Sequence, residues 1–318
     1  MLIAKTLEYC QNHYSSKNGR CANCTHPCKC PGYCSKCLRQ IHYKHCDTNA
    51  RHSYNCSFLS DYYVCRYSFK YTSEIIYALR QDEVSYLQDN KMLKVLSIGC
   101  GPCTDLFALD YLKNTEEYIF NKLKYIGVDL LKDTWKRIHN EIKHYYDNDS
   151  EINAYFCYSN INKLVPTLID KEFKVDLIIM NYLLSDFHKY GGRKGVLDFL
   201  NKLVYYIENV CPDTAIVIND INLSCLRGGG RDYFNMLYKR LSRSGFCCHK
   251  FHFDNNNQKY HFEYGDEYPL NKLLFKETTV NRYKYFLGLN KSCASAQIII
   301  YKEWFLMIIS ASRRTDIP

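Results

Sequence analysis

The chain has 318 residues, of which 47% are hydrophobic and 24% charged, and its formal net charge is +9. This composition excludes a disordered chain and is typical of a globular protein with room for two folding units. No apolar stretch approaches the roughly 18 residues that span a bilayer, and the first residues form no signal-peptide core. We therefore expect a cytoplasmic protein with no membrane partner.

The N-terminal region is rich in cysteine, because ten of the 18 cysteines fall within the first 65 residues. In a reducing compartment, closely spaced cysteines are more often metal ligands than disulfides. We predict a Cys-rich zinc-binding module over residues 1–57, whose core is too short and polar to fold without metal. Its candidate ligands are Cys21, Cys24, Cys28, Cys30, Cys34, Cys37, His42, Cys46 and Cys56.

Two Cys-x-x-Cys pairs, Cys21 with Cys24 and Cys34 with Cys37, carry this prediction. Each pair lets two thiolates from one tight turn bind the same ion, and two pairs complete a tetrahedral site. The number of ligands exceeds one site, so we expect two zinc ions. A structural zinc site contributes on the order of 10 kcal/mol or more to folding. An iron–sulfur cluster or free thiols remain the alternatives.

This module is also basic, with eight Lys and Arg residues against two acidic residues, a net charge of +6. Lys and Arg neutralise phosphates, and the interleaved tyrosines can stack on bases. The pattern suits recruitment of RNA or a ribonucleoprotein. A structural clamp whose lysines only keep it soluble is an equally weighted alternative.

Residues 58–92 form a connector that is dense in aromatic side chains and contains no Gly or Pro between 58 and 88. Leu59, Tyr62, Tyr63, Arg66 and Tyr67 recur at three- and four-residue steps, which predicts one or two helices. A stripe of this kind is more often core than binding surface.

From residue 93 onward, strands alternate with helices. Apolar strands are predicted at 94–98, 123–128, 154–158, 174–180, 214–218, 246–253 and 296–302, with helices at 134–146 and 196–209. The first strand runs directly into Gly99-Cys100-Gly101-Pro102-Cys103 and then a helix. A strand, a glycine turn and a helix open a doubly wound α/β sheet that binds a ligand at the helix N-terminus. A third glycine, which a dinucleotide would need, is absent because Thr104 stands there.

The second strand ends at Asp129, where a carboxylate can accept hydrogen bonds from both hydroxyls of a ribose. Together with the glycine loop, Asn160 after the third strand and the Asp-Leu-Ile-Ile-Met-Asn run that ends at Asn181, this pattern resembles class I S-adenosylmethionine-dependent methyltransferases. The resemblance covers about residues 93–304. It implies a seven-stranded, Rossmann-like methyltransferase sheet, with the donor S-adenosylmethionine lying across the carboxyl ends of the strands.

The resemblance also implies roles for individual residues. Gly99 and Gly101 would lie beneath the methionine part, Asp129 would bind the ribose, and Asn160 would lie near the adenine. Asp105 and Asn181 complete the candidate donor-binding set. Ser97 stands where many members have an acidic residue, and Cys103 replaces a common glycine.

The methyl acceptor is predicted less directly. Asp186, His188 and Asp220 follow strands and are candidates for a base that removes a proton from the acceptor; caps and loop residues are the competing interpretation. We expect RNA or a ribonucleoprotein as acceptor, with Asp186 and Asp220 as the catalytic candidates. The alternatives are a non-catalytic donor-binding sensor or scaffold, and a methyltransferase for a protein or small molecule.

Two features fall outside this scheme. The later cysteines show no ligand spacing, and we interpret them as small apolar core residues; they are Cys100, Cys103, Cys157, Cys211, Cys225, Cys247, Cys248 and Cys293. Residues 307–318 resemble the opening of an unrelated, uncharacterised bacterial family, and we expect residues 305–318 to form a loosely ordered tail.

Overall fold

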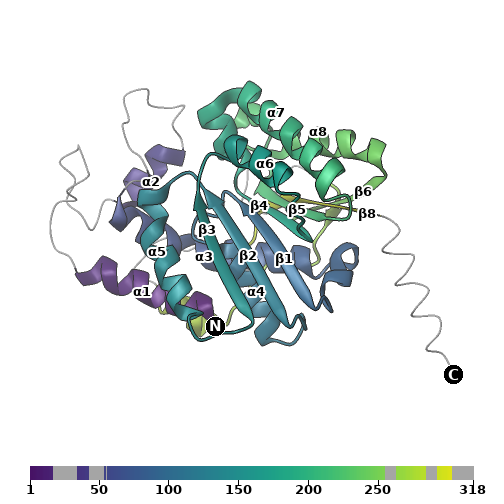
Figure 1. The fold of residues 1–318 in the computed structure, drawn as a ribbon. Helices are drawn as coiled ribbons and strands as arrows, with labels where there is room; N and C mark the ends of the chain where they lie inside the picture. The colour runs from purple at the N-terminus through teal and green to yellow at the C-terminus, as the bar shows by residue number, and fades with distance from the viewer. Residues whose placement is uncertain (17–33, 43–53, 55, 255–262, 284–291, 303–318) are drawn as a thin grey trace.

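The computed structural model describes residues 1–16, 34–42, 54, 56–254, 263–283 and 292–302. Its α-helices are α1 (Leu2–Ser16), α2 (Cys34–His42), α3 (Ser57–Leu79), α4 (Thr104–Asn114), α5 (Lys132–Tyr145), α6 (Ile161–Asp170), α7 (Leu184–Val210), α8 (Arg231–Leu241) and α9 (Glu277–Asn281). Short 3₁₀ helices in the described part lie at Asp82–Leu87, Cys225–Arg227 and Ser242–Ser244. The chain folds into three layers, with helices on both faces of one sheet (Figure 1).

The sheet contains β1 (Met92–Ile98), β2 (Lys122–Asp129), β3 (Ile152–Tyr158), β4 (Leu177–Asn181), β5 (Ala215–Ile221), β6 (Phe246–His252), β7 (Asp266–Glu267) and β8 (Ser295–Lys302). Their order is β3-β2-β1-β4-β5-β8-β6-β7. The first five strands are parallel, and β8 runs antiparallel to both β5 and β6. The α/β class is confirmed, but the prediction of seven strands is wrong, because the two-residue β7 adds an eighth.

The order of the strands reverses between β1 and β4, which lie side by side. In open α/β sheets, ligands bind outside the carboxyl ends of the strands at such a switch point. Fully buried parallel strands read as continuous apolar runs, as in β4 and β5. This pattern is why the sequence predicts these strands well.

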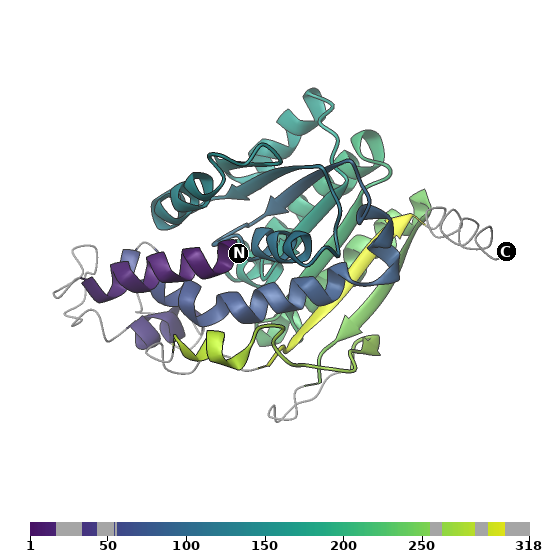
Figure 2. The ribbon, with the colours of Figure 1, turned by 90° about the horizontal axis from the view of Figure 1, so that it is seen from below.

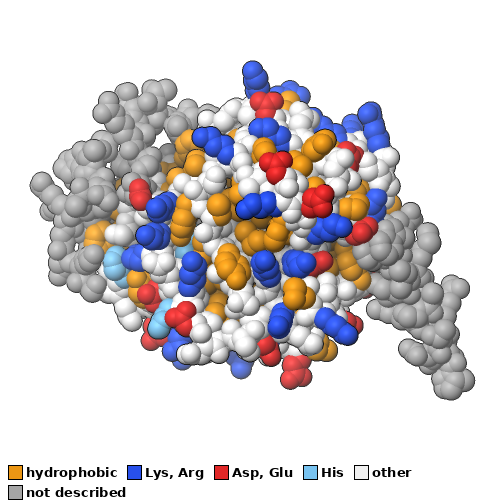
Figure 3. All heavy atoms as spheres, in the orientation of Figure 1, with side chains coloured by type: hydrophobic (Ala, Val, Ile, Leu, Met, Phe, Trp, Pro, Cys, Tyr) orange, Lys and Arg blue, Asp and Glu red, His pale blue; other side chains and the backbone are white. Residues whose placement is uncertain are grey.

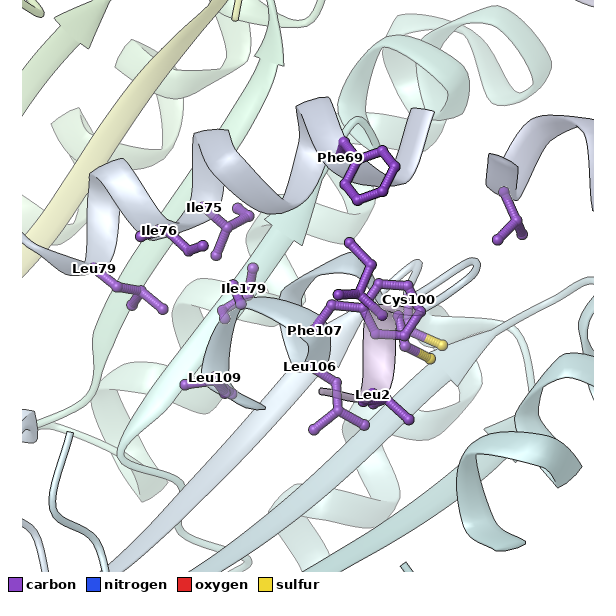
Figure 4. Packing of buried hydrophobic residues seen from close by; sticks show 14 of the residues in the cluster. Leu2, Phe69, Ile75, Ile76, Leu79, Cys100, Leu106, Phe107, Leu109 and Ile179 are labelled. Carbon is purple, nitrogen blue, oxygen red and sulfur yellow. The ribbon is translucent and has the colours of Figure 1, made fainter. Parts of the chain in front are cut away.

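Two apolar clusters fill the space between the sheet and its helices. One contains side chains of α1, α3, α4 and α5, and the other contains side chains of α6, α7 and α8. Figure 1 shows these helix groups on opposite faces. Figure 4 shows side chains of α3, among them Phe69, Ile75 and Leu79, facing Phe107 and Leu109 of α4. The long helix α3 therefore contributes to the hydrophobic core that packs on the sheet.

The predicted module over residues 1–57 lies only partly within the described residues. Within it, α1 runs beside α3 (Figure 2), and Leu2, Ile3 and Leu7 are fully buried in the cluster they share with α4. The backbone N–H of Leu2 donates to a carboxylate oxygen of Asp110 at 2.8 Å. Helix α1 therefore packs onto the sheet domain, and residues 307–318 lie outside the described part.

A buried polar network fastens α3 to the middle of the sheet. The Glu74 carboxylate accepts hydrogen bonds from the Tyr182 hydroxyl at 2.9 Å, the Asn219 amide at 3.0 Å and the Ala294 backbone at 2.9 Å. Glu74 is fully buried, and Lys70 lies 3.7 Å away. A buried carboxylate is tolerated only with such partners. This network fixes the start of α7 and the ends of β4 and β5.

Candidate functional site

The glycine loop leaves β1 at the switch point. Gly99 and Gly101 have φ angles of +69° and +49°, a region that favours glycine. The backbone N–H groups of Gly99 and Cys100 both donate to the Val128 carbonyl, at 2.8 and 3.0 Å. A side chain at Gly99 would meet Leu183 at 2.6 Å. The loop therefore turns sharply between β2 and the N-terminus of α4.

The Asp129 carboxylate, at the end of β2, accepts a hydrogen bond directly from this loop. One carboxylate oxygen accepts from the Gly101 backbone N–H at 3.0 Å, and the other accepts from Leu131 at 2.8 Å. Burial raises the pKa of Asp129, and these hydrogen bonds oppose the rise. Because a carboxylate has about four acceptor positions, both oxygens retain capacity for a further donor. The arrangement can hold a ligand that carries two neighbouring hydroxyl groups.

Asp105 and Asn181 lie beneath the loop. Asp105 is 1% exposed, and its carboxylate accepts from the Tyr125 hydroxyl at 3.0 Å. The Asn181 amide donates to the Thr104 hydroxyl at 2.9 Å and accepts from Asn219 at 2.7 Å. These bonds hold the first turn of α4 against the sheet, so both residues support the loop from within.

Asn160 lies at the end of β3, as the sequence predicts, and precedes α6. Its side-chain oxygen accepts from the backbone N–H of Asn162 at 2.9 Å, which makes it the N-cap of that helix. The residue is exposed. Among the described residues, no hydrogen bond from its amide nitrogen is found. Its predicted place near an adenine stays a prediction.

The two candidate catalytic carboxylates differ sharply in exposure. Asp220 is fully buried, and its oxygens accept from the backbone N–H groups of Ser185 at 3.0 Å and Ile221 at 2.7 Å. The side chain of Asp186, in the first turn of α7, is 41% exposed, and its oxygen lies 3.8 Å from the Lys189 ammonium. Asp220 thus holds the start of α7, whereas Asp186 can reach a ligand. The His188 ring is bonded to the Tyr233 hydroxyl.

Two aromatic side chains lie near this region, Tyr63 of α3 and Trp135 of α5. Trp135 of α5 lies 3.9 Å from the position a Gly101 Cβ would take, and its ring centroid is 5.8 Å from that of Tyr63. Burial raises the pKa of Tyr63, and the charges of Asp186 and Asp129 add to this rise. Tyr63, Asp186 and Asp129 therefore lie within electrostatic range of one another. In the sequence, the signal that points to Tyr63 is the aromatic stripe of the predicted connector, which forms α3.

One prediction about Cys100 and Cys103 needs a correction. Together with His139 they form the only group of three His, Cys, Asp or Glu residues in the described part whose ligand atoms lie close enough for one metal ion. Both cysteines are buried in the apolar cluster, as predicted. The prediction that they lack ligand spacing is wrong, because they have Cys-x-x-Cys spacing and lie beside a histidine. Burial raises the pKa of Cys103, but Cys100 and His139 outweigh it and lower the pKa to about 7.

Most of the predicted zinc ligands lie outside the described residues, namely Cys21, Cys24, Cys28, Cys30 and Cys46. Cys34 and Cys37 lie one turn apart on α2 and are buried, and Cys56 precedes α3. His42 ends α2, and its side chain is outside the described part. The two zinc ions of this region remain a prediction.

On the face in Figure 3, Lys and Arg side chains are spread among acidic and apolar ones. Among the described helices, none has the length and apolar character needed to cross a membrane.

No protein-family model and no curated protein matches the chain. Among solved structures, a SAM-dependent methyltransferase from Archaeoglobus fulgidus is 17% identical, with a TM-score of 0.39, covering 73% of this chain and 94% of its own. Spermidine synthase from Thermotoga maritima is 12% identical, with a TM-score of 0.36, over 72% and 59%. The SAM-dependent methyltransferase from Agrobacterium tumefaciens is 10% identical, with a TM-score of 0.39, over 73% and 60%. Likenesses at this level leave the function to be argued from the residues themselves.

Proposed function

We propose that the chain is an S-adenosylmethionine-dependent methyltransferase. The observation that carries this proposal is the hydrogen bond from the Gly101 backbone to Asp129, at the switch point of the sheet. It sets a carboxylate with spare acceptor positions beside Gly101, where no side chain obstructs the approach of a ligand to the backbone. A nucleoside with two ribose hydroxyls and a small charged extension fits both features.

A dinucleotide is the main competing ligand of such a loop, and Thr104 argues against it. Dinucleotide-binding loops need a third glycine for close packing of the helix on the strand. Here the Thr104 side chain is buried and bonded to Asn181. The ligand we propose therefore carries no pyrophosphate.

We propose Asp129 as the ribose ligand, with Gly99 and Gly101 beneath the methionine part. Asp105 and Asn181 act as positioning residues of the loop. The donor supplies an electrophilic methyl group, so the protein has mainly to align the acceptor and receive its proton. Asp186 is our candidate base, because it is partly exposed while both Asp220 oxygens already accept backbone hydrogen bonds.

For the acceptor, we propose RNA or a ribonucleoprotein recruited by the basic, Cys-rich residues 1–57, with zinc as the metal of that region. The charge of +6 in that range supports this choice. The test is transfer of a tritiated methyl group from the donor into RNA, protein and small-molecule fractions of a cell extract. Label in RNA alone supports RNA, whereas label in another fraction supports a protein or metabolite acceptor.

A non-catalytic sensor is the second candidate, favoured by Cys103, which has a left-handed φ of +66° where a glycine is common. Calorimetric titration with S-adenosylmethionine and S-adenosylhomocysteine separates the cases. Binding without methyl transfer to any fraction identifies a sensor. No binding by the metal-replete chain refutes both.

A further inference from the structure

The strongest unexplained feature is the cluster formed by Cys100, Cys103 and His139. Their sulfur and nitrogen atoms all lie within 4.8 Å of one another. Cys100 Sγ is 3.9 Å from His139 Nε2. All three side chains are buried, with exposures of 6%, 0% and 1%. In a tetrahedral site with zinc–sulfur and zinc–nitrogen bonds near 2.3 and 2.0 Å, such atoms are separated by about 3.5 Å. Small shifts would bring them to a common ion.

The turn between the two cysteines directs them toward one point. The Cys103 backbone N–H donates to the Cys100 carbonyl at 2.7 Å, and Cys103 itself has a φ of +66°. Cys103 stands immediately before α4. A Cys-x-x-Cys turn at the start of a helix is a common way to supply two thiolates to one metal ion.

His139 is held in a fixed orientation by its surroundings. Its Nδ1 lies 2.9 Å from the Tyr158 hydroxyl, and its ring stacks on Phe156 with centroids 4.1 Å apart and planes 12° apart. Its Nε2 faces Cys100 and lies 2.7 Å from the Gly101 carbonyl oxygen. Metal-binding histidines characteristically engage their other ring nitrogen in a hydrogen bond, as Tyr158 provides here.

Gly127 in β2 makes room for the cluster. A Cβ at this position would lie 2.9 Å from Cys100 Sγ and 2.9 Å from the Phe156 ring. A glycine inside a strand weakens it, and often marks a close approach by another group. Here the absent side chain admits the Cys100 sulfur and the ring that supports His139.

From these observations we infer that Cys100, Cys103 and His139 bind a zinc ion beneath the glycine loop. On binding, each thiol releases its proton to solvent and its sulfur binds the metal. His139 gives up the hydrogen bond that Nε2–H donates to the Gly101 carbonyl, and the ring proton moves to Nδ1, where it is donated to Tyr158. The neutral ring then binds through Nε2. Two thiolates then balance the charge of Zn²⁺, so the buried site carries no net charge. The same ligands would leave a negative charge around Cu⁺, close to Asp129, which makes zinc the better fit.

This site is separate from the Cys-rich residues 21–56, and it has a distinct effect. The ion would link the glycine loop to α5, because His139 of α5 lies 39 residues after Cys100 in the chain. The Gly101 carbonyl oxygen lies 3.8 Å from Cys103 Sγ and 2.7 Å from His139 Nε2, so it would be available as a fourth ligand. Zinc would therefore hold the loop in its sharp turn, whether or not S-adenosylmethionine is the ligand.

The test measures zinc per chain in the full-length protein, purified with reductant, saturated with a slight excess of Zn²⁺ and dialysed to remove unbound metal. We compare wild type with Cys100→Ser/Cys103→Ser, and with His139→Gln, which retains hydrogen-bonding capacity. The control is Cys211→Ser, a buried cysteine in the cluster on the opposite face of the sheet. We expect both site variants to bind about one equivalent less zinc than wild type, while the control binds the same amount.

Cobalt substitution gives a second readout. Replacing zinc by Co²⁺ produces sulfur-to-cobalt charge-transfer absorption, which should fall in the double cysteine variant and remain in Cys211→Ser. Circular dichroism shows whether each variant is folded, and if the double variant unfolds, His139→Gln decides. Equal zinc in wild type and a folded site variant overturns the inference. A Cys100–Cys103 disulfide in the zinc-treated, reduced wild type also overturns it.

Discussion

Asp220 makes a quantitative prediction about the pH dependence of stability. It lies fully buried at the end of β5. Burial raises its pKa to about 6, the charge of Asp186 contributes to the rise, and hydrogen bonds from Ser185 and Ile221 oppose it. The perturbation is Asp220→Asn, which keeps the shape of the side chain and removes its titration.

The magnitude follows from the pKa of about 6 and the ordinary value of 3.8. Between these two values the native chain retains a proton on Asp220 that the unfolded chain has released. Because the native state then binds more protons, the stability contributed by the protonated group is lost as pH rises through about 6. The full difference is worth about 3 kcal/mol. The stability of Asp220→Asn minus that of wild type should therefore increase by about 2 to 3 kcal/mol from about pH 4 to about pH 7.

The assay is urea unfolding at a series of pH values, followed by tryptophan fluorescence. Asn can accept only one of the two backbone hydrogen bonds, but this loss is the same at each pH and shifts the whole curve. Asp213→Asn, at an exposed position, controls for the exchange itself. Parallel stability profiles for wild type and Asp220→Asn would refute the raised pKa.

Three further predictions concern other parts of the site. Gly127→Ala should destabilise the chain by about 1 to 3 kcal/mol through overpacking against Cys100, which urea unfolding measures; an unchanged midpoint contradicts the tight contact. Glu74→Ala should cost on the order of 3 to 5 kcal/mol, because it removes the buried acceptor of three hydrogen bonds, and Glu74→Gln should cost less in the same assay. Asp129→Ala should weaken S-adenosylmethionine binding about 10- to 100-fold in calorimetry; equal affinity excludes Asp129 as a ligand.

The central strands and the glycine loop could be predicted because their physics is local. A buried parallel strand is apolar along its whole length, and the loop follows it directly in sequence. The last two predicted strands, at 246–253 and 296–302, are also present, as β6 and β8, and they pair with each other. The sequence does not predict the two-residue β7, because Asp266 and Glu267 are exposed and carry no strand pattern.

Residues whose role depends on distant partners could not be predicted. His139 lies in the middle of an amphipathic helix, and nothing nearby in sequence connects it to Cys100. The buried cap formed by Asp220 becomes visible only when β5 and the start of α7 are brought together. Helix α6 was missed because Pro166 stands inside it, which sequence patterns treat as a break.

The position of β8 has a consequence for synthesis of the chain. β8 comes last among the described strands, yet it lies between β5 and β6. Until residues 295–302 have been translated, β5 is an open edge carrying Ile216, Val217 and Ile218, and β6 can pair only with the short β7. Unpaired apolar edges recruit strands from other molecules. A ribosome that stalls before residue 295 would thus release an aggregation-prone product, which gives the cell a reason to degrade incomplete chains promptly.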